Sequence, residues 1–139
     1  AEGIKRALEA GATVVSGYAT GFFTPYGTIQ QRIPGFGLDE RFGVRNRGAD
    51  LVREGDGIRI AGTPIIADAL HSELELLSGD VICSFTTGKP AVVRNRNALY
   101  ISFDAGTLYM NGAPDRQRDL LRMLGPLLSV DAVEEPAEK

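Results

Sequence analysis

The sequence is poor in the side chains that most often carry chemistry. Its 139 residues include a single cysteine, Cys83, and a single histidine, His71. One thiol excludes an intrachain disulfide, and these two side chains are too few for a structural zinc site. The P-loop, H-E-x-x-H and C-x-x-C patterns are also missing, so we predict neither a metal nor another cofactor. A chain without disulfides is typical of the cytoplasm, and we expect a cytoplasmic protein.

Long apolar runs and an excess of positive charge are missing as well. No stretch of about 20 apolar residues is present to form a membrane-spanning helix. The formal net charge is −3, whereas a general nucleic-acid-binding protein carries a basic surface. We therefore expect neither a membrane nor a nucleic acid as a partner. Hydrophobic residues make up 43% of the chain, which is enough for one packed domain of this length.

The first 16 residues predict a helix followed by a strand. Ile4, Ala7 and Leu8 have the i, i+3, i+4 spacing of a buried helical face, and Gly11 is suited to end that helix. The segment ATVVS (12–16) is short, β-branched and apolar without alternation, which is typical of a strand buried on both faces of a parallel sheet. A helix that leads into such a strand indicates an α/β domain. Because a strand normally precedes the first helix, we expect either a fragment incomplete at its N-terminus or a sheet completed by another segment.

Further along the chain the apolar period changes to two, which predicts strands. Alternation predicts one strand over 65–77, and three more over 81–85, 91–94 and 98–103. Short strands with turns at 46–48 and 55–57 are expected within 44–60. We assign the last hairpin turn to Asn95 and Asn97, since Asn tolerates positive φ.

Helix signals are fewer in this second part. Residues 38–43 indicate one helical turn, and Pro114 is suited to begin a final helix. Gly125 and Pro126 are expected to interrupt that helix. The domain then covers residues 1–128, and residues 129–139 form a polar, acidic tail or linker.

Residues 21–37, called here the aromatic loop, are unusually apolar for a connecting segment. They contain four glycines, two prolines and four aromatic residues, with Arg32 as the single charge. Three interpretations fit this composition: the loop folds back on its own domain, forms a subunit interface or neighbouring active-site wall, or closes a small-molecule pocket. The candidate contact residues are Phe22, Phe23, Tyr26, Arg32 and Phe36.

The turn that follows the first strand has the spacing of a nucleophile elbow but lacks the nucleophile. Gly17 and Gly21 flank the turn as such elbows require, yet Ala19 stands at the centre. Thr20 has a hydroxyl, one position out of register. His71 is expected on the polar face of a strand and Cys83 in the core, so we predict no catalytic residue. Asp104, which follows a strand predicted to be antiparallel, is expected to be a turn or capping residue.

Three segments together resemble a known family over residues 3–128. They are IKRALEAGATVVSGYATG, PGFGLDERFGV and GKPAVVRN…ALYIS, and they resemble the middle, trimerisation domain of family 42 glycoside hydrolases, the β-galactosidases. The resemblance implies a flavodoxin-like, three-layer α/β fold similar to class I glutamine amidotransferases, with an added antiparallel β-rich segment. In those amidotransferases the elbow holds the catalytic cysteine. Ala19 at that position implies the same architecture without the chemistry.

The resemblance also implies a function. The chain is expected to be a non-catalytic oligomerisation domain of a β-galactosidase-type glycoside hydrolase, forming a homotrimer and contacting the catalytic barrel of the same parent chain. The aromatic loop would then wall the sugar site of a neighbouring subunit. The barrel, which carries both catalytic carboxylates in that family, is not among these 139 residues. Two alternatives stay open: a class I amidotransferase-like enzyme that uses Thr20, and a small-molecule (sugar) binding module.

Overall fold

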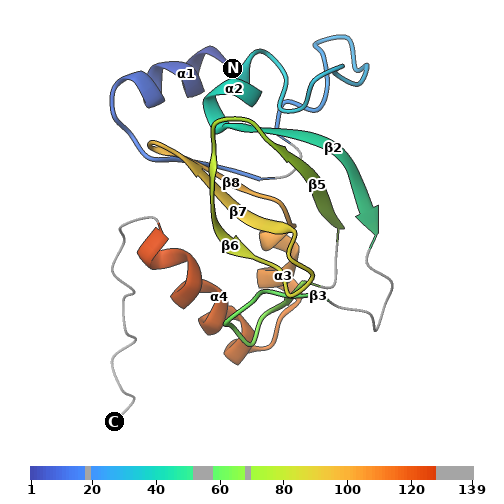
Figure 1. Cartoon of the computed structure of the whole chain (residues 1–139), viewed down its shortest axis with the longest axis vertical. Helices are drawn as coiled ribbons and strands as arrows, with labels where there is room; N and C mark the ends of the chain where they lie inside the picture. Colours follow the sequence, from blue (N-terminus) through green and yellow to red (C-terminus); the bar gives the residue numbers. More distant parts are fainter. Residues whose placement is uncertain (18–19, 52–57, 68–69, 128–139) are drawn as a thin grey trace.

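The computed structural model describes residues 1–17, 20–51, 58–67 and 70–127. They form a mixed α/β domain, with α1 and α2 at one end and α3 and α4 at the other (Figure 1). The helices are α1 (Glu2–Glu9), α2 (Leu38–Phe42), α3 (Ala105–Asn111) and α4 (Pro114–Leu127). The strands are β1 (Val14–Ser16), β2 (Val44–Leu51), β3 (Ile58–Arg59), β4 (Ile66–Ala67), β5 (Leu70–Leu76), β6 (Asp80–Ser84), β7 (Pro90–Asn95) and β8 (Ala98–Ile101). The predicted turn at 55–57 and the tail at 129–139 lie outside the described residues.

The main sheet has the order β1-β8-β7-β6. The two hairpins that join β6, β7 and β8 are antiparallel, as predicted, whereas β1 lies parallel to β8 with Val14 opposite Ala98. The prediction that β1 is buried on both faces was wrong. Val14 packs with Leu8 of α1, but Val15 points to the other face and is 41% exposed. Among the described residues, β1 is an edge strand whose outer face nothing covers.

A second, two-stranded ribbon of β2 and β5 lies beside the main sheet (Figure 1). The turn predicted at 46–48 is instead a β-bulge between Asn46 and Gly48, so β2 continues through it as one strand. The single strand predicted over 65–77 is also wrong, because β4 pairs with β3 whereas β5 pairs with β2. Alternation in sequence could not show that this segment changes partner.

The helices largely follow the sequence signals. α1, α2 and α4 begin where expected, but α4 continues through Pro126 to Leu127, so the predicted interruption is not observed. Helix α3 was not predicted from the sequence. Asp104 caps it by accepting hydrogen bonds from the Thr107 backbone N–H (3.0 Å) and Oγ1 (2.6 Å), which confirms the capping role predicted for Asp104. Within the described ranges, no helix has the length and apolarity needed to cross a bilayer.

The core consists of two apolar clusters on opposite faces of β7 and β8. Val92 and Leu99 belong to the cluster that Leu108 of α3 and Leu120 of α4 complete. The next residue of each strand, Val93 or Tyr100, belongs to the cluster with Leu8 of α1 and Phe42 of α2. Both strands are therefore continuous apolar runs, as expected where both faces are covered. Cys83 is half-buried against the α3–α4 cluster, as predicted for a small core residue, and burial raises the pKa of its thiol.

The turn between β7 and β8 joins two helices to the main sheet. Its positive φ (57°) belongs to Arg96, so the assignment of positive φ to the asparagines was wrong. The asparagines instead supply side-chain amides. Asn95 Nδ2 donates to the Arg41 carbonyl of α2 (2.9 Å), and Asn97 Nδ2 donates to the carbonyls of Leu8 (2.9 Å) and Ala12 (2.6 Å) at the end of α1. The Leu8 carbonyl also accepts from the Gly11 N–H (3.1 Å), so Asn97 adds a second donor where the helix ends.

We predict that Asn97→Ala lowers the free energy of unfolding by about 1–2 kcal/mol, because it removes two hydrogen bonds to carbonyls at one helix end. Urea denaturation followed by circular dichroism measures this change. Asn111→Ala, at an exposed position of α3, is the matched control and should change stability by less than about 0.5 kcal/mol. Equal stabilities of the two variants would contradict the capping role of the turn.

Candidate functional site

The aromatic loop contains an ordered hairpin over residues 22–30. Phe23 and Ile29 form an antiparallel bridge, and the Gln30 N–H donates to the Phe22 carbonyl (2.8 Å). At the tip, the hydroxyls of Thr24 and Thr28 lie 2.7 Å apart, and the Thr24 N–H donates to the Thr28 carbonyl (2.7 Å). The loop therefore has its own internal hydrogen bonds, which fix its shape.

The hairpin presents large apolar side chains to solvent. Tyr26 at the tip is 92% exposed, and the bridged pair Phe23 and Ile29 are 58% and 62% exposed. Phe36 is exposed as well, while Phe22 is half-buried with its ring 5.3 Å from that of Phe23. Burial against its own domain, the first of the three interpretations, therefore does not describe Phe23, Tyr26 or Phe36.

Arg32 and Ile29 also contribute to the surface of the aromatic loop. Arg32, the single charge of the loop, is exposed beside the hairpin in the chain. Ile29 was not predicted as a contact residue. The sequence TPYG (24–27) has the proline and glycine of a type I turn that ends in a left-handed glycine. Such a turn forms a three-residue hairpin loop over 25–27, which would have placed Ile29 opposite Phe23.

The neck of the aromatic loop is held by two glycines. The Gly35 N–H donates to the Gly21 carbonyl (3.0 Å), and Gly21 has a φ of +64°. A Cβ on Gly21 would lie 2.7 Å from the Gly35 nitrogen, closer than real Cβ contacts allow. Gly21 is therefore required both by its backbone conformation and by the close approach of the two chain segments.

Beyond the neck, the loop is anchored to a buried polar network. The Asn46 N–H donates to the Ile33 carbonyl (2.7 Å), and Asn46 Nδ2 donates to Ser72 Oγ (2.8 Å). The Tyr100 side chain shares hydrogen bonds with both Asn46 and Ser72, and all three residues are buried. Burial raises the pKa of Tyr100 to about 12, although its two hydrogen bonds act in the opposite direction. The network thus connects the aromatic loop, the β2–β5 ribbon and β8.

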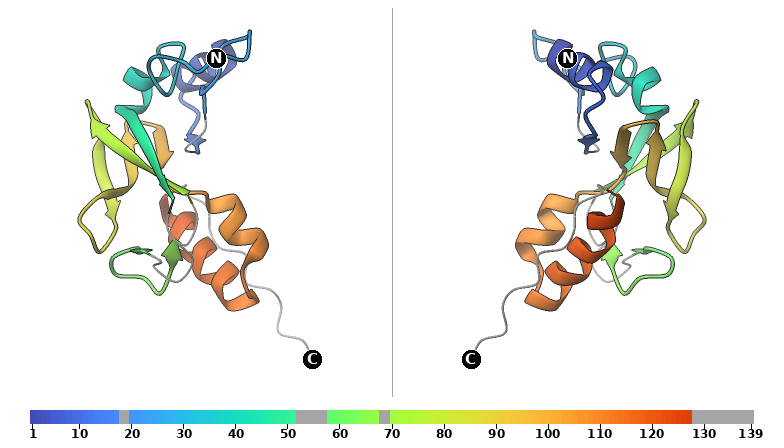
Figure 2. Two further views of the ribbon diagram at one scale, coloured as in Figure 1. Left: turned by 90° about the vertical axis from the view of Figure 1, so that its right-hand side faces the viewer. Right: turned by 90° about the vertical axis from the view of Figure 1, so that its left-hand side faces the viewer.

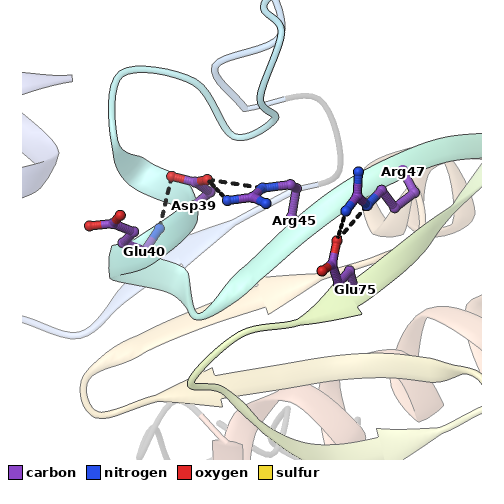
Figure 3. Close-up of polar contacts among 5 residues, drawn as sticks. All are labelled: Asp39, Glu40, Arg45, Arg47 and Glu75. Carbon is purple, nitrogen blue, oxygen red and sulfur yellow. Dashed lines mark hydrogen bonds and ion pairs between the residues drawn. The ribbon is translucent and has the colours of Figure 1, made fainter.

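A buried carboxylate, that of Asp39, lies close to the loop, and both of its oxygens accept hydrogen bonds. Asp39, at the start of α2, accepts hydrogen bonds at Oδ2 from Arg45 Nη2 (3.1 Å) and Nε (3.3 Å), and at Oδ1 from the Glu40 N–H (3.0 Å) (Figure 3). Arg47, two residues after Arg45 on β2, forms an ion pair with Glu75 of β5 (Figure 3). Asp39 therefore acts by fixing α2 on β2 and has no oxygen lacking a partner.

The elbow-like turn borders a cleft at the carboxyl ends of β1 and β8. The Thr20 N–H donates to the Gly17 carbonyl (3.3 Å), which closes the turn. Gly17 and Thr20 line a cleft of about 500 Å³ together with Ile101, Phe103, Asp104, Ala105 and Gly106. The expectation that the strand before Asp104 has only antiparallel neighbours was wrong, because β8 is parallel to β1. This position is where open α/β sheets often bind ligands.

The cleft offers little chemistry in its described residues. Both oxygens of Asp104 already accept hydrogen bonds from Thr107. Cys83 packs in the α3–α4 cluster, whereas Ala19 and the side chain of His71 lie outside the description. Within the part of the chain that the structure describes, no three His, Cys, Asp or Glu side chains gather as metal ligands would.

The fold and these two features define an α/β domain with an ordered, exposed apolar hairpin and an elbow-like turn that borders a cleft. The family model of the β-galactosidase trimerisation domain matches residues 1–127, and the chain belongs to this family. The resemblance noted in the sequence is thereby confirmed. A comparison with curated protein sequences found no match.

Solved structures share the fold at low sequence identity. A β-galactosidase of Rahnella sp. R3 is 18% identical with a TM-score of 0.72, over 94% of this chain and 21% of its own. A GH42 β-galactosidase of G. stearothermophilus is 20% identical with a TM-score of 0.68, over 95% of this chain and 20% of its own. An exo-β-1,4-mannosidase of an Opitutaceae bacterium is 16% identical with a TM-score of 0.54, over 78% of this chain and 20% of its own. This chain spans about a fifth of the length of these enzymes.

We predict that Gly21→Ala opens the neck of the aromatic loop, whereas Gly17→Ala is tolerated. An alanine at Gly21 is strained by about 1–3 kcal/mol because of the positive φ and the close Gly35 backbone. A Cβ on Gly17 meets nothing within 4 Å. Amide hydrogen exchange at Gly35 is the measurement, and its protection should fall only in Gly21→Ala. Equal exchange in both variants would show that the neck does not depend on the close contact.

We predict that Tyr100 makes stability fall at alkaline pH. Its pKa is raised from about 10 in the unfolded chain to about 12 in the fold, so the native state binds the proton more tightly. The stabilisation is complete below pH 10 and is lost as the pH rises toward 12. Denaturation across this range, with ultraviolet absorbance to follow tyrosine ionisation, measures the effect.

Tyr100→Phe is the control for this titration. It should lower stability at neutral pH by about 1–3 kcal/mol, because Asn46 and Ser72 lose a buried partner. It should also abolish the late ionisation step. A late step that persists in Tyr100→Phe would assign it to another tyrosine.

Proposed function

We propose that this chain holds a β-galactosidase-type glycoside hydrolase in a trimer, and that the aromatic loop is an intersubunit contact. Membership of the trimerisation-domain family supports the assembly role. The observation that carries the assignment to the loop is the ordered hairpin, which exposes Tyr26, Phe23 and Ile29 together. No catalytic role is assigned to this segment.

Physical considerations support a contact role for the hairpin. Removing apolar surface from water contributes about 25 cal/mol per Å², so side chains as exposed as these have much to gain from a partner. Aromatic residues are enriched among the side chains that dominate interface energies. Because the tip hydrogen bonds and the Gly21–Gly35 neck already fix the shape, little conformational freedom is lost on binding.

We propose further that the fold is of the class I amidotransferase type and is completed by a strand on the free edge of β1. The parallel β1–β8 pair, the elbow-like turn and the clusters on both faces of β7 and β8 support this arrangement. The completing strand would come from another segment of a longer chain. We also propose that the domain covers residues 1–128, that residues 129–139 are a tail or linker, and that the protein is cytoplasmic.

The activity of the parent chain is proposed from its relatives. The structures from Rahnella sp. R3 and G. stearothermophilus are named as β-galactosidases, whereas the one from the Opitutaceae bacterium is named as an exo-β-1,4-mannosidase. The fold of this domain therefore does not by itself determine the sugar. We propose a β-galactosidase as the parent, with its catalytic barrel as a further partner and Tyr26, Phe22, Phe36 and Arg32 as candidate residues around a neighbouring subunit's sugar site. The alternative enzyme, with Thr20 as nucleophile, would need a general base in the cleft. Asp104 does not supply one, because both of its carboxylate oxygens accept hydrogen bonds from Thr107.

The test is the solution mass of the chain by light scattering at two concentrations. We expect about three times the 14.9 kDa of one chain. Tyr26→Asp should reduce the mass to that of a monomer, because it places a charge at the centre of a desolvated contact. Met110→Asp is the matched control, since Met110 is 81% exposed on α3. A folded monomer at both concentrations would contradict self-sufficient trimerisation, and a trimer unaffected by Tyr26→Asp would remove the loop from the interface.

A further inference from the structure

A three-fold ring places a constraint on the surface that receives the aromatic loop. In such a ring each contact is heterologous, so a patch on one copy meets a different patch on the next. A loop that lies away from the three-fold axis therefore packs against a different surface of its neighbour and not against the same loop. If the proposed trimer is correct, and this step depends on that proposal, the ring needs a second contact surface.

Outside the loop, the exposed large apolar side chains of the described residues fall mainly into two groups. Tyr109, Met110 and Leu121 lie on α3 and α4. The other group lies where β5 ends and β6 begins, and it consists of Leu76, Leu77 and Val81, which are 44%, 38% and 38% exposed. Residues 76–81 are called here the β5–β6 turn.

We propose that the β5–β6 turn of a second copy of this chain is the surface that receives the aromatic loop. The turn is rigid. The N–H groups of Leu77 (2.8 Å) and Gly79 (3.0 Å) both donate to the Gly43 carbonyl at the end of α2. Gly43 and Gly79 approach each other so closely that a Cβ on either would overlap the other's backbone. A surface held in this way loses little freedom when a partner binds.

Charge favours the β5–β6 turn over the helical group. The aromatic loop contains one charged residue, Arg32, and the turn also contains one, Asp80, of opposite sign. Both are exposed. Leu121, by contrast, lies on a helix in which arginines outnumber aspartates, so Arg32 would meet an excess of like charge there. The arginines are at positions 116, 118 and 122, and the aspartates are at 115 and 119. Opposite charges at the rim of a contact guide its orientation, whereas like charges disfavour it.

The positions of the two surfaces fit a head-to-tail contact. Figure 2 shows the β5–β6 turn projecting on one side of the molecule and the hairpin of the aromatic loop on the other. Both lie toward the end of the molecule that α1 and α2 occupy (Figure 1). One copy can therefore use both surfaces at once, each with a different neighbour.

The first test is the mass of Leu77→Asp by light scattering, with circular dichroism to verify the fold. We expect a folded monomer where the wild-type chain is a trimer. Asp80→Arg is a second variant that leaves the apolar residues in place, and it should raise the concentration needed for trimer formation several-fold. Leu121→Asp is the matched control on the helical group, 52% exposed, and should remain trimeric.

The second test mixes two defective chains. Tyr26→Asp keeps an intact turn and Leu77→Asp keeps an intact loop, so together they can form one complete contact but cannot close a ring. We expect sedimentation over a concentration series to show a 1:1 heterodimer that neither variant forms alone. A mixture that stays monomeric at every concentration would contradict the pairing of these two surfaces.

The outcomes separate this inference from the proposed function. A monomeric wild-type chain would contradict self-sufficient trimerisation and, with it, this inference. A trimeric wild-type chain that remains trimeric as Leu77→Asp, with Asp80→Arg also without effect, would contradict only the role of the β5–β6 turn. Loss of the trimer in Leu121→Asp, with the turn variants intact, would assign the receiving surface to α4.

Discussion

The hydroxyl of Tyr100, buried between Asn46 and Ser72, joins the parts of this domain that do not share a sheet. Tyr100 belongs to β8 of the main sheet, Asn46 to β2 and Ser72 to β5 of the ribbon. The backbone N–H of Asn46 also holds the Ile33 carbonyl, which fixes the end of the aromatic loop. Polar groups removed from water must be paired, so the three side chains constrain one another's positions. The placement of the ribbon and of the loop both depend on this network.

The short helices and the loop are held largely by backbone groups and their side-chain partners. The asparagines on either side of Arg96 occupy the carbonyls at the ends of α1 and α2. Asp39 ties the start of α2 to Arg45 of β2. Gly21 and Gly35 bring the two chain segments at the loop neck into contact. A helix of five or eight residues is marginal alone, so these contacts determine where the helices and the aromatic loop lie.

The cleft beside the elbow-like turn and the hairpin of the aromatic loop differ in what their side chains can do. The cleft beside the elbow-like turn contains a carboxylate whose oxygens are occupied and a threonine hydroxyl. The hairpin offers three exposed apolar side chains on a fixed backbone. Hydrophobic contact needs only shape and area, whereas catalysis needs aligned groups with accessible protons. The geometry therefore favours assembly over chemistry as the use of this domain.

Much of the local structure follows from the sequence by itself. The spacing of Ile4, Ala7 and Leu8, the proline at 114 and the apolar runs of β7 and β8 predict the right elements, because these signals act over a few residues. The low charge of the aromatic loop likewise marks it as unusual, and Ala19 at the centre of the elbow excludes the nucleophile expected there.

Other features depend on contacts between residues far apart in the sequence. The parallel pairing of β1 with β8 joins residues more than 80 positions apart, and the change of partner between β4 and β5 leaves no trace in their alternation. The positive φ falls on Arg96 and not on Asn95 or Asn97, because the amides of both asparagines bind carbonyls at the helix ends. Exposure of the hairpin was also decided by tertiary structure. Apolar composition is the same for a buried and an exposed loop, and only the packing of the rest of the chain determines which side chains are left without cover.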